Sequence, residues 1–118
     1  EAIQVRFDPA RASYEGILEV FFRMHDPTTR NRQGNDVGTQ YRSALYWTTP
    51  EQEELARVSK ERYQAVLTGN GLDPITTEIA PADDRVFYYA EPEHQQYLEK
   101  NPHGYDCHAN TGYALPAL

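Results

Sequence analysis

The chain has 118 residues, enough for one domain and too few for two. Apolar residues make up 39% of it and nine residues are tyrosine, a composition that indicates a folded domain and excludes a disordered chain. The net charge of −7 argues against nonspecific binding to nucleic acid, and no apolar run approaches the ~20 residues of a membrane span. The single cysteine, Cys107, favours a reducing compartment, so we expect a cytoplasmic protein.

The N-terminal stretch predicts a strand. Residues 2–8, AIQVRFD, alternate apolar and polar side chains as a half-buried strand does, and Pro9 ends the pattern. The first residue is Glu1 rather than methionine, so the chain begins inside this element. We therefore expect a sequence that is incomplete at its N-terminus.

A helix is predicted next, followed by a long polar loop. Ser13 can cap the helix, and Pro27 closes the segment because the residue before a proline resists helical geometry. Apolar side chains recur at helical spacing at Tyr14, Ile17, Leu18, Phe21 and Met24. Residues 26–40 then read DPTTRNRQGNDVGTQ, and a loop of about fifteen residues is usually either functional or disordered.

Residues 43–47 predict a short buried strand, and a strong helix start follows it. Thr49 is the expected cap, Pro50 lies in the first turn, and Gln52 comes three residues after the cap. The helix is expected to stop at the turn-forming residues 69–71. Its predicted inward-facing residues are Leu55, Val58, Val66 and Leu67.

The last part of the chain predicts shorter elements. Residues 75–79 alternate as a strand, residues 86–89 form a second strand, and residues 91–101 form a short helix. From residue 103 onward there are too many turn formers for regular structure. Because strands and helices interleave, we expect an α+β fold, a two-layer sandwich in which helices pack on one mixed sheet, in a single domain over residues 1–118.

The loop sequence GNDVGTQY concentrates groups that suit an oxyanion. Gly34 and Gly38 would let the backbone approach a ligand, while Asp36 and Tyr41 offer a carboxylate and a phenol that can steer or protonate a developing oxyanion. Two plainer interpretations stay open. Asn35 and Asp36 before a glycine make a tight turn by themselves, and Tyr41 can pack its ring in the core with its hydroxyl in water.

The C-terminal region raises the question of metal or thiol chemistry. His94, His103, Cys107 and His108 offer nitrogen and sulfur ligands, but their spacing matches no structural zinc pattern, so no metal is expected. Cys107 is either a small inert residue or a redox thiol on a mobile tail. A thiol hydrolase that pairs Cys107 with His108 is disfavoured, because adjacent side chains rarely orient for proton transfer.

Three stretches resemble the A-type peptide methionine sulfoxide reductases: HDPTTRNRQGNDVGTQYRSALY, ITTEIAP and FYYAEPEHQQYLEKNPHGY. The resemblance runs from Glu1 to about Tyr105 in the family's order. It implies an oxidoreductase that repairs oxidised proteins by reducing methionine S-sulfoxide, free or in proteins, without a cofactor. In the family reaction a cysteine thiolate attacks the sulfoxide sulfur and becomes a sulfenic acid, which condenses with a second cysteine to a disulfide that thioredoxin reduces.

The same resemblance implies the site residues. Glu1 matches the glutamate that binds and protonates the sulfoxide oxygen, a role that needs a carboxylic acid kept neutral near pH 7. Tyr41 matches the tyrosine that donates to the same oxygen, so Glu1 and Tyr41 are the expected substrate-binding residues. Asp36 matches the aspartate that orders the site, and Cys107 matches the first resolving cysteine.

The sequence also departs from the family pattern. It contains no GCFWG motif, which carries the family's nucleophile and the Phe-Trp pair that receives the substrate methyl, and Trp47 stands in another context. The tail DCHANTGYALP resembles the shorter two-cysteine members. We therefore expect about the C-terminal two-thirds of a reductase domain, inactive by itself and with bare apolar surface. The alternative is a noncatalytic module that binds methionine-containing segments.

Overall fold

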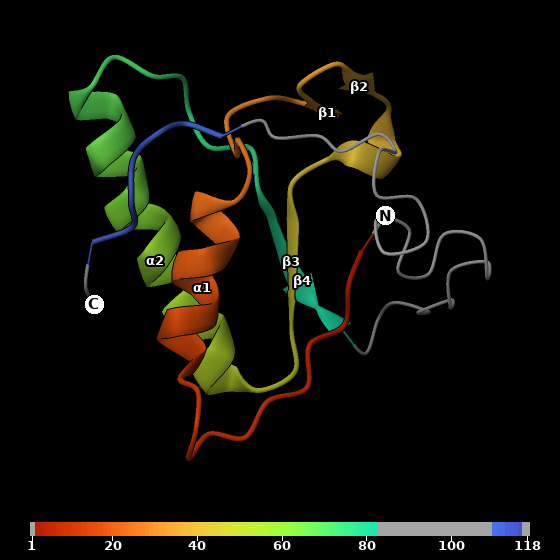
Figure 1. Cartoon of the computed structure of the whole chain (residues 1–118), viewed down its shortest axis with the longest axis vertical. Helices are drawn as coiled ribbons and strands as arrows, with labels where there is room; N and C mark the ends of the chain where they lie inside the picture. The colour runs from red at the N-terminus through yellow and green to blue at the C-terminus, as the bar shows by residue number, and fades with distance from the viewer. Residues whose placement is uncertain (1, 83–109, 117–118) are drawn as a thin grey trace, which may run out of the picture.

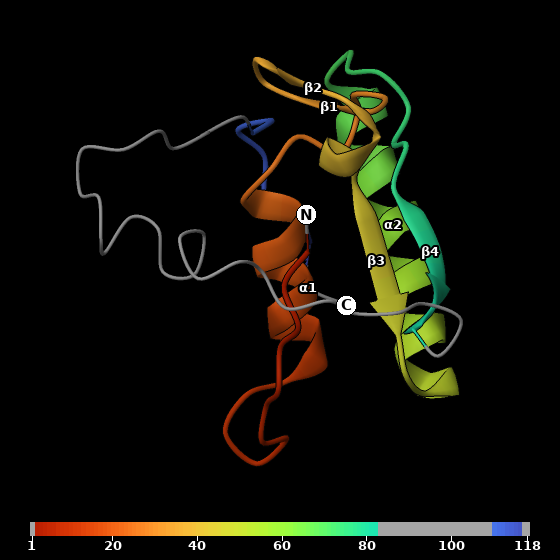
Figure 2. The ribbon, with the colours of Figure 1, turned by 90° about the vertical axis from the view of Figure 1, so that its right-hand side faces the viewer.

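The structure, a computed structural model, describes residues 2–82 and 110–116 (Figure 1). The elements follow in the order α1 (Tyr14–Arg23), β1 (Arg32–Gln33), β2 (Asp36–Val37), the 3-10 helix η1 (Thr39–Tyr41), β3 (Ala44–Trp47), α2 (Pro50–Gly69) and β4 (Glu78–Pro81). The long helix α2 packs against α1 and against both strands of the β3–β4 pair, which lie side by side in Figure 2. None of the helices in this part of the chain is long and apolar enough to cross a membrane.

Helix α1 begins where the sequence predicts it. The Ser13 hydroxyl accepts a hydrogen bond from the Gly16 amide at 3.0 Å and so satisfies one of the free donors of the first turn. Leu18 and Phe22 are buried on the inner face. Met24 continues the apolar spacing but lies beyond the last turn, and 57% of it is exposed.

The start of α2 also follows its local sequence. Thr49 caps the helix, with its hydroxyl accepting from the Gln52 amide at 3.2 Å, and Pro50 is the first helical residue. The Gln52 side chain reaches back to the amide of Thr48 at 2.8 Å, one residue earlier than in the usual capping box. The start of α2 is thereby joined directly to the end of β3, without a long loop between them.

The end of α2 is a Schellman motif. The Leu72 amide donates to the Leu67 carbonyl at 2.9 Å, and the Gly71 amide donates to the Thr68 carbonyl at 3.1 Å. Gly71 adopts a φ of 77°, in the left-handed region that this motif requires. The predicted helix stop is confirmed.

The core lies between α1, α2 and the parallel strands. Of the residues predicted to face inward on α2, Leu67 is fully buried, and Leu55 and Val66 pack against the core from partly buried positions. The sequence interpretation missed Tyr63, whose ring meets that of Phe22 at a centroid distance of 5.3 Å. The buried apolar residues are Leu18, Phe22, Leu45, Ala56, Tyr63, Leu67, Ile75 and Leu115.

The α+β class is confirmed. The described strands form two separate two-stranded sheets, with β3 and β4 parallel and β1 and β2 antiparallel. The strand predicted at residues 75–79 begins only at Glu78, because the Thr76 amide donates to the Pro27 carbonyl of the long loop. Ile75 and Thr77, which precede the strand, are buried. The expectations for residues 86–89 and 91–101 fall outside the described residues.

The predicted N-terminal strand is wrong. Residues 2–8 are irregular, and Ile3 and Val5 are 77% and 51% exposed. A strand is stable only when a neighbouring strand satisfies its backbone groups, and no strand in residues 2–82 or 110–116 pairs with this stretch.

Candidate functional site

Asp36 and Tyr41 are the two expected site residues that the structure describes. The elements that carry them, β2 and η1, lie at one corner of the ribbon (Figure 1). Asp36 lies on the β1–β2 hairpin and Tyr41 on η1, which contacts β1 directly. Both side chains are partly buried. Glu1 and Cys107 lie outside the described residues, so the convergence of all four remains a prediction.

Backbone geometry joins the hairpin to η1. The Gly38 amide donates to the Asn31 carbonyl at 2.8 Å, and the Tyr41 amide donates to the Gly38 carbonyl at 3.0 Å. Gly38 has a φ of 148°, a conformation that L side chains rarely adopt. The tight turn of the hairpin falls at Gly34 and Asn35, one residue earlier than the sequence suggested.

The hairpin is tied to the end of α1 through Gln33. The Gln33 side-chain amide donates to the Asp26 carbonyl at 2.7 Å, and its oxygen accepts from the Asp26 amide at 3.2 Å. Gln33 is also the strand partner of Asp36. The Asp26 carboxylate accepts from the Thr28 amide at 2.9 Å, which closes a local turn.

The remainder of the long loop is tied to the segment before β4. The Thr76 amide donates to the Pro27 carbonyl at 2.8 Å, and the Thr76 hydroxyl donates to the Thr29 carbonyl at 2.7 Å. Residues 26–40 therefore form an ordered scaffold with a hairpin and a 3-10 turn.

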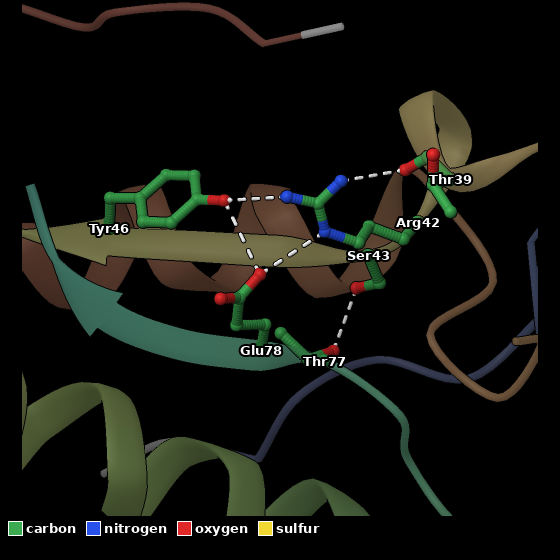
Figure 3. A network of polar contacts seen from close by, with 6 residues as sticks. All are labelled: Thr39, Arg42, Ser43, Tyr46, Thr77 and Glu78. Atoms are coloured by element: carbon green, nitrogen blue, oxygen red, sulfur yellow. Dashed lines mark hydrogen bonds and ion pairs between the residues drawn. The ribbon is translucent and has the colours of Figure 1, made fainter. Parts of the chain in front are cut away.

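Arg42 braces η1 from the exposed face of the strand pair (Figure 3). Its Nε donates to Glu78 Oε2 at 3.2 Å, and its Nη1 donates to the Thr39 carbonyl at 2.8 Å. The Tyr46 hydroxyl lies 3.4 Å from both the guanidinium and Glu78 Oε2. The hydrogen bond to Glu78 raises the pKa of the Arg42 guanidinium above its usual value. Arg42 thus links the turn that carries Tyr41 to β4.

A buried polar chain lies on the other side of the same strands. His25 Nδ1 is 2.6 Å from the Phe21 carbonyl, and His25 Nε2 is 2.7 Å from the Ser43 hydroxyl. Ser43 Oγ is in turn 2.7 Å from Thr77 Oγ1. Figure 3 marks this hydrogen bond with a dashed line. Burial lowers the pKa of His25, against smaller raising contributions from its bond to Phe21 and from the charge of Asp26.

Sequence reasoning did not single out this chain of groups. Two local signals were present: His25 follows the last turn of a predicted helix, and Ser43 is a polar residue that opens an apolar strand. The pairing itself could not be found, because 18 residues separate His25 from Ser43 and 34 separate Ser43 from Thr77.

Metal chemistry gains no support from the part of the chain that is described. Within residues 2–82 and 110–116 no group of three or more His, Cys, Asp or Glu side chains could hold an ion. The candidate ligands His94, His103, Cys107 and His108 lie outside these ranges.

The family model for peptide methionine sulfoxide reductase matches residues 1–116. The chain belongs to this family. It is 54% identical over 116 residues to the peptide methionine sulfoxide reductase MsrA of Streptomyces griseus and 56% identical over 117 residues to that of Cronobacter sakazakii. Each match covers 98% of this chain but only 52% and 54% of the two relatives. The chain therefore spans about half the length of these curated relatives.

Solved structures of the reductase family show the same fold. Methionine sulfoxide reductase A of Corynebacterium diphtheriae superposes with a TM-score of 0.78 at 45% identity, covering 94% of this chain and 56% of that one. Reduced Mxr1 from Saccharomyces cerevisiae gives a TM-score of 0.76 at 42% identity, with coverage of 93% and 56%. The resemblance drawn from the sequence is confirmed, whereas the roles of the individual residues remain predictions.

Proposed function

We propose that this chain forms part of an enzyme that reduces methionine S-sulfoxide, in oxidised proteins and as the free amino acid. The observation that carries the proposal is the joint placement of Asp36 and Tyr41. They lie on a hairpin and an adjoining turn that are tied to α1 and β4, in a chain that matches the reductase family over residues 1–116.

Tyr41 supplies the hydrogen bond to the sulfoxide oxygen in this proposal. A thiolate attacks the sulfoxide sulfur, the sulfur–oxygen bond breaks, and one oxygen with a proton ends on the cysteine sulfur as a sulfenic acid. The methionine sulfur gains the two electrons that the cysteine loses. The oxygen gains negative charge during the attack, so a phenol donor lowers the barrier. Glu1 gives the proton, and Asp36 orders the polar groups around the oxygen.

Cys107 is the proposed resolving thiol. Its thiolate attacks the sulfenic sulfur and water leaves, which forms a disulfide that a thioredoxin-type dithiol then reduces. The 118 residues hold this one cysteine, so the sulfur that attacks the substrate is a different one. We place the reaction in a reducing compartment such as the cytoplasm, where such dithiols are kept reduced.

An assay of the chain with a methionine-(S)-sulfoxide peptide and dithiothreitol tests the proposal in two steps. The chain by itself is expected to give little turnover, because Cys107 has no sulfenic acid to resolve. Substantial turnover that survives in a Cys107→Ser variant would contradict this assignment.

In the second step, the chain replaces its matched region in the Streptomyces griseus relative. We expect the chimera to reduce the S epimer, and we expect Tyr41→Phe to lower kcat by roughly 100- to 1000-fold, the usual effect of removing one oxyanion donor. A folded chimera without activity, or a Tyr41→Phe chimera with unchanged kcat, would overturn the proposed role.

A further inference from the structure

His25 and Asp26, adjacent at the end of α1, each hold one of the two segments that carry the expected site residues. Asp26 binds the side chain of Gln33 on the hairpin that bears Asp36. His25 binds Ser43, which lies two residues after Tyr41. One dipeptide directly after α1 therefore contacts both arms of the candidate site.

The hydrogen-bond chain from His25 has only one direction when the ring is neutral. The Phe21 carbonyl can only accept, so His25 Nδ1 carries the hydrogen across the 2.6 Å contact. Nε2 is then an acceptor, and the Ser43 hydroxyl must donate to it. With its one hydrogen used, Ser43 accepts from the Thr77 hydroxyl.

The surroundings favour the neutral ring. Ser43 and Thr77 are 4% and 3% exposed, and the Phe21 ring lies against the imidazole at a centroid distance of 4.5 Å. A protonated ring would donate at both nitrogens, so Ser43 would have to accept from it and both hydroxyls would have to turn around. The neutral form with hydrogen on Nδ1 satisfies every member of the chain without that change.

Ser43 transmits this constraint to the turn that bears Tyr41. Its side chain is held between His25 and Thr77, and its carbonyl accepts from the Glu78 amide at 3.0 Å. Arg42, the residue before Ser43, is the C-cap of the 3-10 turn. The downstream end of the turn is thus fixed at once to α1 and to β4.

We propose that His25, as the neutral tautomer with hydrogen on Nδ1, is a positioning residue that acts through Ser43 to hold the Tyr41 phenol where it can donate to a substrate oxygen. The inference rests on the proposed function, since that function gives Tyr41 its substrate. His25 itself does not touch the substrate in this account.

Two variants of His25 separate positioning from folding. In His25→Gln the side-chain oxygen is long enough to accept from the Ser43 hydroxyl, whereas the side chain in His25→Asn can still donate to the Phe21 carbonyl but is too short to reach Ser43. We expect amide hydrogen exchange at Tyr41 to rise on the order of 10-fold in His25→Asn and less than about 2-fold in His25→Gln. The Leu72 amide at the far end of α2 is the internal control and should not change.

Nitrogen NMR of the unmodified chain measures which ring nitrogen of His25 carries the hydrogen. The account predicts one protonated nitrogen at neutral pH, Nδ1, with Nε2 carrying none. An Nε2–H tautomer, or exchange at Tyr41 that is the same in His25→Asn as in the unmodified chain, would overturn the inference.

A titration with a substrate analogue distinguishes this inference from the proposed function. N-acetyl-methionine-(S)-sulfoxide amide is titrated into the chain while the amide signals of Asp36 and Tyr41 are followed. Binding that is weakened roughly 10-fold by His25→Asn and restored by His25→Gln supports both ideas. If the unmodified chain does not respond, the proposed function loses its support, while the exchange and tautomer results still decide whether His25 positions the turn.

Discussion

The hydroxyl oxygens of Tyr63 and Thr111 lie 2.6 Å apart, although 48 residues separate them in the sequence. The Tyr63 hydroxyl donates to the Tyr113 carbonyl at 2.7 Å, so the Thr111 hydroxyl must be the donor toward Tyr63. Leu115, two residues after Tyr113, is buried in the core. Residues 110–116 are therefore attached to α2, beside which they run in Figure 1.

This attachment predicts the effect of Tyr63→Phe. The ring is fully buried and phenylalanine retains it, so the variant loses the hydroxyl and its two hydrogen bonds but leaves no large cavity. We expect the free energy of unfolding to fall by about 1–2 kcal/mol in chemical denaturation. Tyr113→Phe is the matched control, because Tyr113 takes part through its carbonyl. Equal stability of Tyr63→Phe and the unmodified chain would show that the attachment contributes nothing.

The two glycines at the end of α2 predict opposite effects of the same substitution. Gly69 is the last helical residue and a Cβ there would meet no atom within 4 Å, so Gly69→Ala should stabilise the chain by about 0.5–1 kcal/mol. Gly71 also has open space, but its φ is 77°, so Gly71→Ala should cost about 1–2 kcal/mol in backbone strain. Thermal denaturation of both variants measures these two changes in stability. A change of the same sign in both would contradict the assigned helix end.

The ion pair between Arg42 and Glu78 predicts a modest, salt-dependent coupling. Its side chains are 44% and 35% exposed, and pairs of this kind contribute about 0.2–1 kcal/mol. A double-mutant cycle with Arg42→Ala and Glu78→Ala measures the coupling free energy, which should shrink at high salt because exposed charges are screened. A coupling of zero at low salt would mean that the contact with Glu78 does not contribute to holding Arg42 against the turn.

The lowered pKa of His25 predicts a loss of stability in weak acid. In the unfolded chain the group titrates near its ordinary value of 6.5, while burial in the folded chain moves the pKa below that value. As pH falls through this window the unfolded state takes up a proton first, so the free energy of unfolding decreases until the folded pKa is passed. Asp26 is the charged group that faces His25 and partly opposes the shift; Phe21, Ser43 and Thr77 carry no charge.

Unfolding of the unmodified chain and of His25→Gln between about pH 7.5 and pH 5 measures this linkage. The variant removes the titration of His25, and its other effects on stability do not depend on pH in this range. The stability difference between the two proteins should move in favour of the variant as pH falls. A difference that is independent of pH, or an NMR titration of His25 above its ordinary pKa, would contradict the buried neutral ring.

The sequence predicted those features that depend on neighbouring residues. The caps at Ser13 and Thr49 and the stop at Gly71 were found because capping and left-handed turns are decided within a few positions. The strand expected at residues 2–8 failed because a strand needs a partner, which alternation alone cannot supply.

The same distinction, between residues that are close in the sequence and residues that are far apart, applies to the candidate site. Asp36 and Tyr41 were singled out through a family motif, and they lie near each other because only five positions, with a bend at Gly38, separate them. The hydrogen-bond chain from His25 through Ser43 to Thr77 was not predicted, since three separate segments of the chain contribute one residue each. Periodicity also missed Tyr63, whose hydroxyl finds its partners 48 and 50 residues further along the chain.

The proposed function places Asp36 and Tyr41 beside the oxygen of bound methionine S-sulfoxide. NMR titration of the chain with the S epimer, the R epimer and unoxidised N-acetyl-methionine amide tests it most directly, with Tyr41→Phe as the variant. We expect the S epimer to shift the Asp36 and Tyr41 amide signals at lower concentration than the other two ligands, and we expect Tyr41→Phe to weaken this response. An equal response to all three ligands, or a response to the S epimer that Tyr41→Phe leaves unchanged, would contradict it.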